Sequence, residues 1–151
     1  MNLEQILKKN IEVLKRLELS FKDSIEHINY IDLDNLKTFR DYEPIDAFFD
    51  RFERTVDNLF QSIFRTLYHI ENLKSPNSLL DLSSFIVNTG IIDDIENLIE
   101  LKKIRNQIAH EYIWLGISNT KEFIDLILEH SNSLFKIIEN VKNYSQKYLK
   151  N

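Results

Sequence analysis

The chain has 151 residues, of which 43% are hydrophobic and 28% are charged, and its formal net charge is −5. This balance is typical of one globular domain with its own core, and it argues against a disordered chain or a general nucleic-acid coat protein. The chain contains no cysteine, which excludes disulfide bonds and thiolate metal sites. It also has no apolar run of about 20 residues and no apolar signal segment, so we expect a cytoplasmic protein without membrane contact.

The first third of the chain predicts two long helices. Apolar residues recur at three- and four-residue steps from about Leu3 to Ile28, which predicts a first helix over that range. A short and irregular segment follows over residues 32–42. Pro44 suits the first turn of a helix, so we expect the second long helix to begin there and to carry its apolar stripe to Ile70.

Turn and capping residues divide the middle of the chain. Ser75 and Pro76 suit the N-cap and the first position of a third, short helix, and Gly90 suits its C-terminal end. The next helix would begin at Asp93 or Asp94, whose carboxylates favour a helix N-terminus.

Gly116 is expected to end that helix, and a last helix would begin at one of three adjacent capping residues, Ser118, Asn119 or Thr120. No stretch shows the alternation of a strand. The sequence therefore predicts a single all-α domain over residues 1–151, an antiparallel bundle of four main helices plus one short helix.

Several phenylalanines lie outside the main stripe of the second predicted helix. Phe49, Phe60 and Phe64 form a second apolar track beside it. A helix that is apolar on two faces needs more than one neighbour. This track favours equally a central helix of the bundle and a helix at an oligomer interface.

Residues 105–112, with the sequence RNQIAHEY, are the most informative part of the chain. On a helix, Arg105 falls on the same side as apolar residues, where an unpaired guanidinium is costly. Asn106 and His110 are four residues apart and share a neighbouring face. A phosphate that is held by Arg105 and attacked with help from His110 would explain this combination. A structural ion pair would explain only the arginine, and its acid would be one of three on the second helix, Asp50, Glu53 or Asp57.

The two central residues of this motif do not point the same way. Arg105 and His110 are five residues apart, so they diverge by about 140° on a straight helix. A two-fold dimer could bring two motif helices together across its axis, so that both chains supply Arg105 and His110 to a shared cleft. The motif thus favours a homodimer.

The pattern R-N-x-x-x-H-x-Y resembles the signature of HEPN-domain proteins, and the final Tyr112 is similar to the HepT toxin branch. Residues 89–93 and residues 48–57 are also similar to that family, and the resemblance covers roughly residues 5–145. It implies a HEPN-like fold and metal-independent cleavage of RNA at Arg105 and His110, with Asn106 in support. It further implies a type VII-like toxin–antitoxin module, in which a partner nucleotidyltransferase silences the toxin by transferring AMP to Tyr112.

Two other interpretations stay open at this point. The chain could be a non-catalytic, dimeric helical partner of a minimal nucleotidyltransferase, or an interaction bundle in which the motif is accidental. The spacing of its acids and histidines matches no metal site, and it has no glycine-rich phosphate loop, so we expect no cofactor. We interpret the remaining histidines, His27, His69 and His130, as structural or surface residues.

Overall fold

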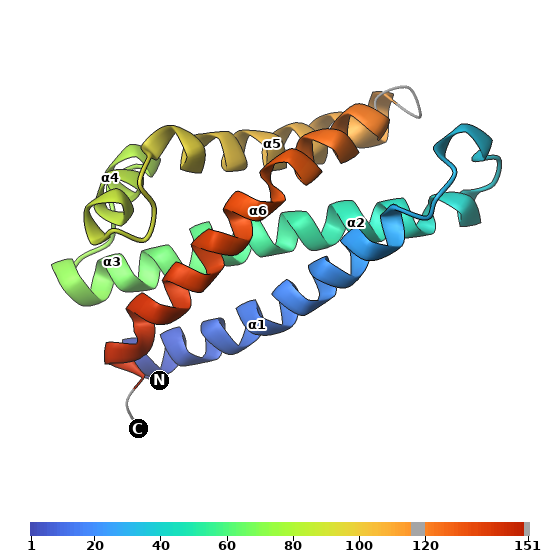
Figure 1. Ribbon diagram of the computed structural model, residues 1–151. Helices are drawn as coiled ribbons and strands as arrows, with labels where there is room; N and C mark the ends of the chain where they lie inside the picture. The colour runs from blue at the N-terminus through green and yellow to red at the C-terminus, as the bar shows by residue number, and fades with distance from the viewer. Residues whose placement is uncertain (116–119, 150–151) are drawn as a thin grey trace.

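The computed structural model describes residues 1–115 and 120–149, and for residues 111–115 it describes the helical backbone without the side chains. In this part of the chain every regular element is helical, which confirms the all-α prediction and a helical bundle (Figure 1). No helix among these residues is both long enough and apolar enough to span a bilayer. The α-helices are α1 (Leu3–Ile28), α2 (Phe39–Asp57), α3 (Phe64–Asn72), α4 (Leu79–Thr89), α5 (Ile95–Leu115) and α6 (Thr120–Ser145).

Helix α1 has the bounds that its apolar stripe predicts. Asn2 caps it, because its side chain accepts a hydrogen bond from the Gln5 backbone at 2.8 Å while the Gln5 side chain accepts one from the Asn2 backbone at 2.9 Å. The stripe is buried along the helix at Leu7, Ile11, Leu14, Phe21 and Ile28. Local capping and periodicity therefore suffice to define this element.

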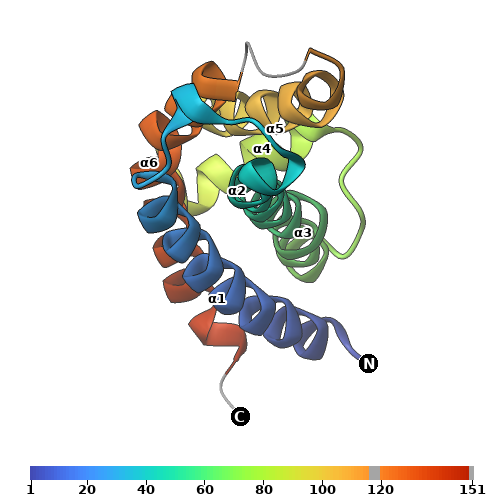
Figure 2. The ribbon, with the colours of Figure 1, turned by 90° about the vertical axis from the view of Figure 1, so that its right-hand side faces the viewer.

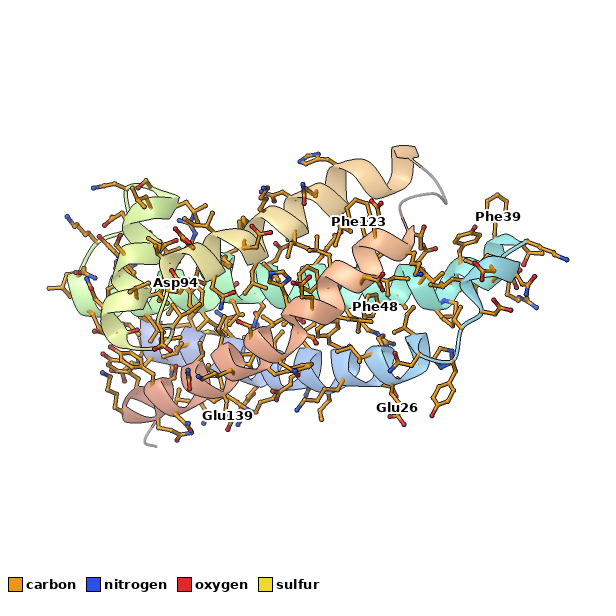
Figure 3. The ribbon with its side chains drawn as sticks, turned by 45° about the horizontal axis from the view of Figure 1, so that its top comes forward. Glu26, Phe39, Phe48, Asp94, Phe123 and Glu139 are labelled. Atoms are coloured by element: carbon orange, nitrogen blue, oxygen red, sulfur yellow. The ribbon has the colours of Figure 1, made fainter. Side chains whose placement is uncertain are left out.

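Helix α2 begins five residues earlier than the sequence predicted. Thr38 is its N-cap and forms a reciprocal pair with Asp41, whose carboxylate accepts the Thr38 backbone N–H at 2.9 Å. Pro44 is therefore the sixth residue of the helix, so the prediction that it opens the first turn is wrong. The capping pair therefore defines the start of the helix more strongly than the proline does. Phe39, the first residue of the helix, extends into solvent with 96% of its surface exposed (Figure 3).

Helices α2 and α3 form one continuous helical rod, joined by a single π-helical segment, Asn58–Ile63. Figure 2 shows the rod nearly end on, with α1 and α6 to its left and α4 and α5 above it. Its second phenylalanine track is buried inside one chain, with Phe49 2%, Phe60 3% and Phe64 0% exposed. Of the two alternatives that the sequence left open for this track, its burial selects the central helix of the bundle, because the same chain already covers it.

Helix α4 begins at Leu79, three residues after Pro76, so the predicted start at Ser75 and Pro76 is wrong. Ser78 is the N-cap, and its side chain accepts the Asp81 backbone N–H at 3.0 Å. Gly90 ends the helix as predicted, in the left-handed conformation with φ +82°. This short helix lies at one end of the bundle, beside α3 and α5 (Figure 1).

Helices α5 and α6 complete the bundle and pack against each other. Asp94 precedes α5, and its carboxylate accepts the Glu96 backbone N–H at 2.9 Å, in agreement with one of the two predicted starts. Thr120 is the first residue of α6. The predicted helix end at Gly116 and the alternative caps Ser118 and Asn119 lie outside the described residues.

Candidate functional site

The motif residues of α5 lie on two sides of the helix. Leu98 and Leu101 are buried, and Arg105 continues their side with 22% of its side chain exposed. Asn106 and His110 are both exposed on another face. The helix therefore separates the arginine from the amide and the imidazole, as the spacing of residues along α5 requires.

Arg105 is bound by Asp57, the last residue of α2. Its Nε donates to Asp57 Oδ1 at 2.7 Å and its Nη2 donates to Asp57 Oδ2 at 2.8 Å. These hydrogen bonds from one side of the fork raise the pKa of Arg105 further above its ordinary value. The ion pair with an upstream acid, which the sequence offered as the alternative explanation of Arg105, is present, and Asp57 is the acid among the three candidates.

The pair with Asp57 uses only part of the guanidinium. A guanidinium has five N–H donors, and the two on Nε and Nη2 that face Asp57 leave the two on Nη1 and one on Nη2 for other acceptors. The carboxylate also fixes the plane of the fork, which reduces the conformational freedom lost when a second anion binds. Structural pairing and phosphate binding by Arg105 are therefore compatible.

Two further charged residues surround the pair. Glu53 lies one turn before Asp57 on α2, and burial raises the pKa of its carboxyl, although Arg105 opposes that shift. Lys102 lies one turn before Arg105 on α5, with its Nζ 4.0 Å from Asp57 Oδ1 and 5.7 Å from the centre of the Phe60 ring. The pair thus belongs to a small charged cluster between α2 and α5.

A groove of about 340 Å³ runs along the exposed face of α5 and reaches α4. Asn106 and His110 line it together, so the structure brings these two predicted residues to one surface. Two partly exposed apolar residues, Ile99 on α5 and Leu79 on α4, also line it, at 42% and 39% exposure. The remaining lining residues are Lys102, Lys103 and Gln107.

The predicted site residues are not assembled into one cleft by a single chain. Arg105 is not among the residues that line the groove, whereas Asn106 and His110 are. Tyr112, the predicted AMP acceptor, belongs to α5, but its side chain lies outside the described residues. The structure thus links Arg105 to Asp57 and Asn106 to His110, as two adjacent pairs.

Sequence reasoning missed the position of Lys102. The sequence shows only a cluster of cations, Lys102, Lys103 and Arg105, and a lysine in such a cluster more often lies on a solvated face. In the structure its side chain is 18% exposed and reaches both the Asp57 pair and the groove. Its spacing to Asn106 and His110, at successive four-residue steps, was the signal that placed it in the same row.

The other histidines occupy ordinary positions. The ring Nδ1 of His130 lies 2.9 Å from the Leu126 carbonyl oxygen within α6, His27 is exposed on α1, and His69 is half-buried near the end of α3. Within the described ranges, no group of three or more His, Asp or Glu side chains is placed to hold a metal ion.

Comparisons of the chain with models of protein families, with curated proteins and with solved structures give no match.

Proposed function

We propose that the protein is a HEPN-like endoribonuclease that acts as the toxin of a two-gene toxin–antitoxin module and cleaves RNA without a metal ion. The observation that carries this proposal is the arrangement on α5. A guanidinium fork that is oriented by Asp57 lies next to an exposed groove containing Asn106 and His110. A fixed cation for phosphate and an accessible imidazole are the two groups that cleavage of a phosphodiester by an internal hydroxyl requires.

In the proposed reaction, His110 accepts the proton of a ribose 2′-hydroxyl, whose oxygen attacks the adjacent phosphorus. Arg105 donates to the non-bridging oxygens as negative charge builds on them. The bond from phosphorus to the 5′-oxygen breaks, and a protonated His110 of the second chain supplies a proton to that oxygen. The products are a 2′,3′-cyclic phosphate and a 5′-hydroxyl. Asn106 orients the phosphate or the imidazole.

The proposal includes a homodimer, because one chain directs Arg105 and His110 to different sides of α5. The buried phenylalanines of the central rod are not available for an interface. The groove face is the better candidate, since Leu79, Leu80 and Ile99 are 39%, 63% and 42% exposed there or beside it. A two-fold contact through these apolar residues would bring the two α5 helices near each other and leave the groove open at the edge of the interface, so that both copies of the motif would border one cleft.

The regulatory part of the proposal concerns Tyr112. This residue follows His110 by two positions on α5. A partner nucleotidyltransferase would transfer AMP from ATP to its hydroxyl, with release of pyrophosphate. The added nucleotide carries its own phosphate, which would compete with RNA for Arg105 by charge and by volume.

A second function is favoured by one observation, the neutralisation of Arg105 by Asp57. If the pair is purely structural, the chain is a non-catalytic dimeric partner of the nucleotidyltransferase, and the groove face is its docking surface. Arg105 would then stabilise α2 against α5 and have no contact with RNA.

The test is RNA cleavage by the purified protein, with and without a chelator. We expect cleavage in both conditions, products ending in a 2′,3′-cyclic phosphate, and no cleavage of a strand whose 2′-hydroxyls are replaced by hydrogen. Arg105→Ala and His110→Ala proteins prepared in the same way control for a contaminating nuclease. Absence of cleavage by the unmodified protein, with tight binding to the nucleotidyltransferase, would instead establish the non-catalytic function.

A further inference from the structure

Lys102 connects the two parts of the candidate site. Among the described residues, it alone both lies within ion-pair distance of Asp57 and lines the groove with Asn106 and His110. The neighbouring Lys103 also lines the groove but is exposed and makes no ion pair with Asp57. The structure thus distinguishes two adjacent lysines by their contacts.

The charge of Lys102 is poorly compensated. Asp57 gives its short, two-point contact to Arg105, whereas the Lys102 Nζ stays 4.0 Å away. Burial lowers the pKa of Lys102, and the nearby cations Arg105 and Arg65 lower it further, against the opposing effect of Asp57. The cluster also contains the Glu53 carboxylate, but that group interacts with Arg105 and Asp57 and does not contribute to the pKa shift of Lys102. An ammonium has three N–H donors, and among the described residues the carboxylate contact of Lys102 is the long approach to Asp57, so donors remain for an anion in the groove.

Helix geometry sets how far Lys102 lies from the reacting group. Lys102, Asn106 and His110 follow each other at four-residue steps along α5, and a four-residue step rises about 6 Å. The backbones of Lys102 and His110 are therefore about 12 Å apart along the axis. At that separation the two side chains serve different points of an extended strand.

We infer that Lys102 is a phosphate-binding residue of the RNA site that holds a phosphate next to the scissile one in the strand. This inference rests on the proposed ribonuclease function and adds a substrate contact to it. An ammonium group at this position binds the strand equally in the ground state and the transition state. Its loss should therefore raise KM and leave kcat nearly unchanged.

The test compares Lys102→Gln with the control Lys9→Gln, at an exposed lysine on α1 outside the groove, and with the charge-retaining Lys102→Arg. Binding is measured with a single-stranded DNA oligonucleotide, which lacks the attacking 2′-hydroxyl, over a range of salt concentrations. We expect Lys102→Gln to bind about ten-fold more weakly and to lower the salt slope by about 0.7, the value for one phosphate contact on a single strand. Lys9→Gln and Lys102→Arg should stay within about three-fold of the parent protein.

Cleavage of RNA of the same sequence provides the second measurement. Lys102→Gln should raise KM by about ten-fold with kcat within about two-fold of the parent. If the parent protein binds and cleaves but Lys102→Gln behaves like Lys9→Gln, the inference is overturned and the proposed function stays intact. A parent protein that neither binds nor cleaves would overturn both.

Thermal unfolding separates this role from a structural one. Burial and two neighbouring cations disfavour the charged form of Lys102 in the folded chain, so removal of the charge should leave Tm unchanged or raise it. Lys102→Met, which keeps the apolar stem over Phe60, serves as a second variant if the glutamine disturbs packing. A fall in Tm that accounts for the lost binding in both variants would show that Lys102 is structural.

Discussion

The carboxylate of Asp57 and the guanidinium of Arg105 meet side by side, through two hydrogen bonds of 2.7 and 2.8 Å that join the end of α2 to the middle of α5. The contact spans 48 positions in the sequence. It also lies where the central rod changes from α-helix to the π-helical segment that begins at Asn58. Single π-helical turns occur often at functional sites, because they displace the residues beside them from regular helical register.

The first prediction concerns the removal of Asp57. Asp57→Ala leaves a guanidinium that is 22% exposed without its bidentate partner, which should lower the free energy of unfolding by roughly 2 kcal/mol. It should also lower RNA cleavage at least ten-fold, because the Arg105 fork loses its fixed plane. Urea unfolding and cleavage rates measure the two effects.

Asp50→Ala is the matched control on the same helix. Asp50 pairs with Arg54 at 2.8 Å, but those side chains are 56% and 68% exposed, so the free energy of unfolding should change by less than about 0.5 kcal/mol. Equal losses of stability in the two variants would mean that the Asp57 pair contributes no more than an ordinary surface contact.

The second prediction is that His110→Ala abolishes cleavage without loss of stability. A positioned general base contributes on the order of 10²–10⁴ in rate, and an exposed side chain contributes little to the core. His27→Ala, an exposed histidine on α1, should leave both activity and Tm unchanged. Retention of activity within a few-fold of the parent would remove His110 from the mechanism.

The third prediction distinguishes the shape of the Arg105 head group from its charge. Arg105→Lys keeps one positive charge but cannot span both oxygens of Asp57 and also present a planar edge to a phosphate. We expect near-complete loss of cleavage with only a partial loss of stability, measured on the same preparation. A fully active lysine variant would show that a point charge is enough at this position.

The sequence predicts a helix boundary correctly where the residues that define it are close together in the chain. Helix α1 and the end of α4 at Gly90 depend on capping and on periodicity within a few residues, so both were predicted correctly. The starts of α2 and α4 differ from the prediction, because the caps Thr38 and Ser78 define them and the prolines Pro44 and Pro76 do not. A proline is merely tolerated in the first turn of a helix, whereas a capping side chain satisfies the unpaired N–H groups of the helix N-terminus.

The candidate site was predictable only in part. The divergence of Arg105 and His110 follows from helix geometry, and the sequence offered three acids as partners for the arginine. The selection of Asp57 depends on the rotation of α2 against α5, which a single sequence does not specify. The burial of Phe49, Phe60 and Phe64 likewise depends on tertiary packing, so the sequence alone left core and interface as equal alternatives for them.

The fourth prediction tests the composite site. Arg105→Ala and His110→Ala proteins should each be inactive, but mixed dimers would contain one cleft with an intact Arg105 from one chain and an intact His110 from the other. Mixing should therefore restore part of the activity that both single variants lack. The recovered rate should stay below that of the parent, because a mixed dimer has one His110 and lacks the second that protonates the 5′-oxygen. The variant Ile99→Glu places a charge on the groove face, so it should weaken the dimer and abolish this rescue. The control Leu19→Glu, at a 68% exposed position on α1, should do neither. A monomer at micromolar concentration by sedimentation would contradict the shared cleft.

The last prediction concerns the regulation of the site through Tyr112. Incubation of the parent protein with the nucleotidyltransferase and ATP should add the mass of AMP and stop cleavage, since the new phosphate competes for the guanidinium that Asp57 orients. Tyr112→Phe removes only the acceptor oxygen, so it should cleave RNA normally and escape this silencing. Tyr30→Phe, at an 84% exposed tyrosine beyond the end of α1, controls for indiscriminate modification of accessible phenols. If Tyr112→Phe is modified and inhibited as strongly as the parent, the partner must act through another residue or by covering the groove.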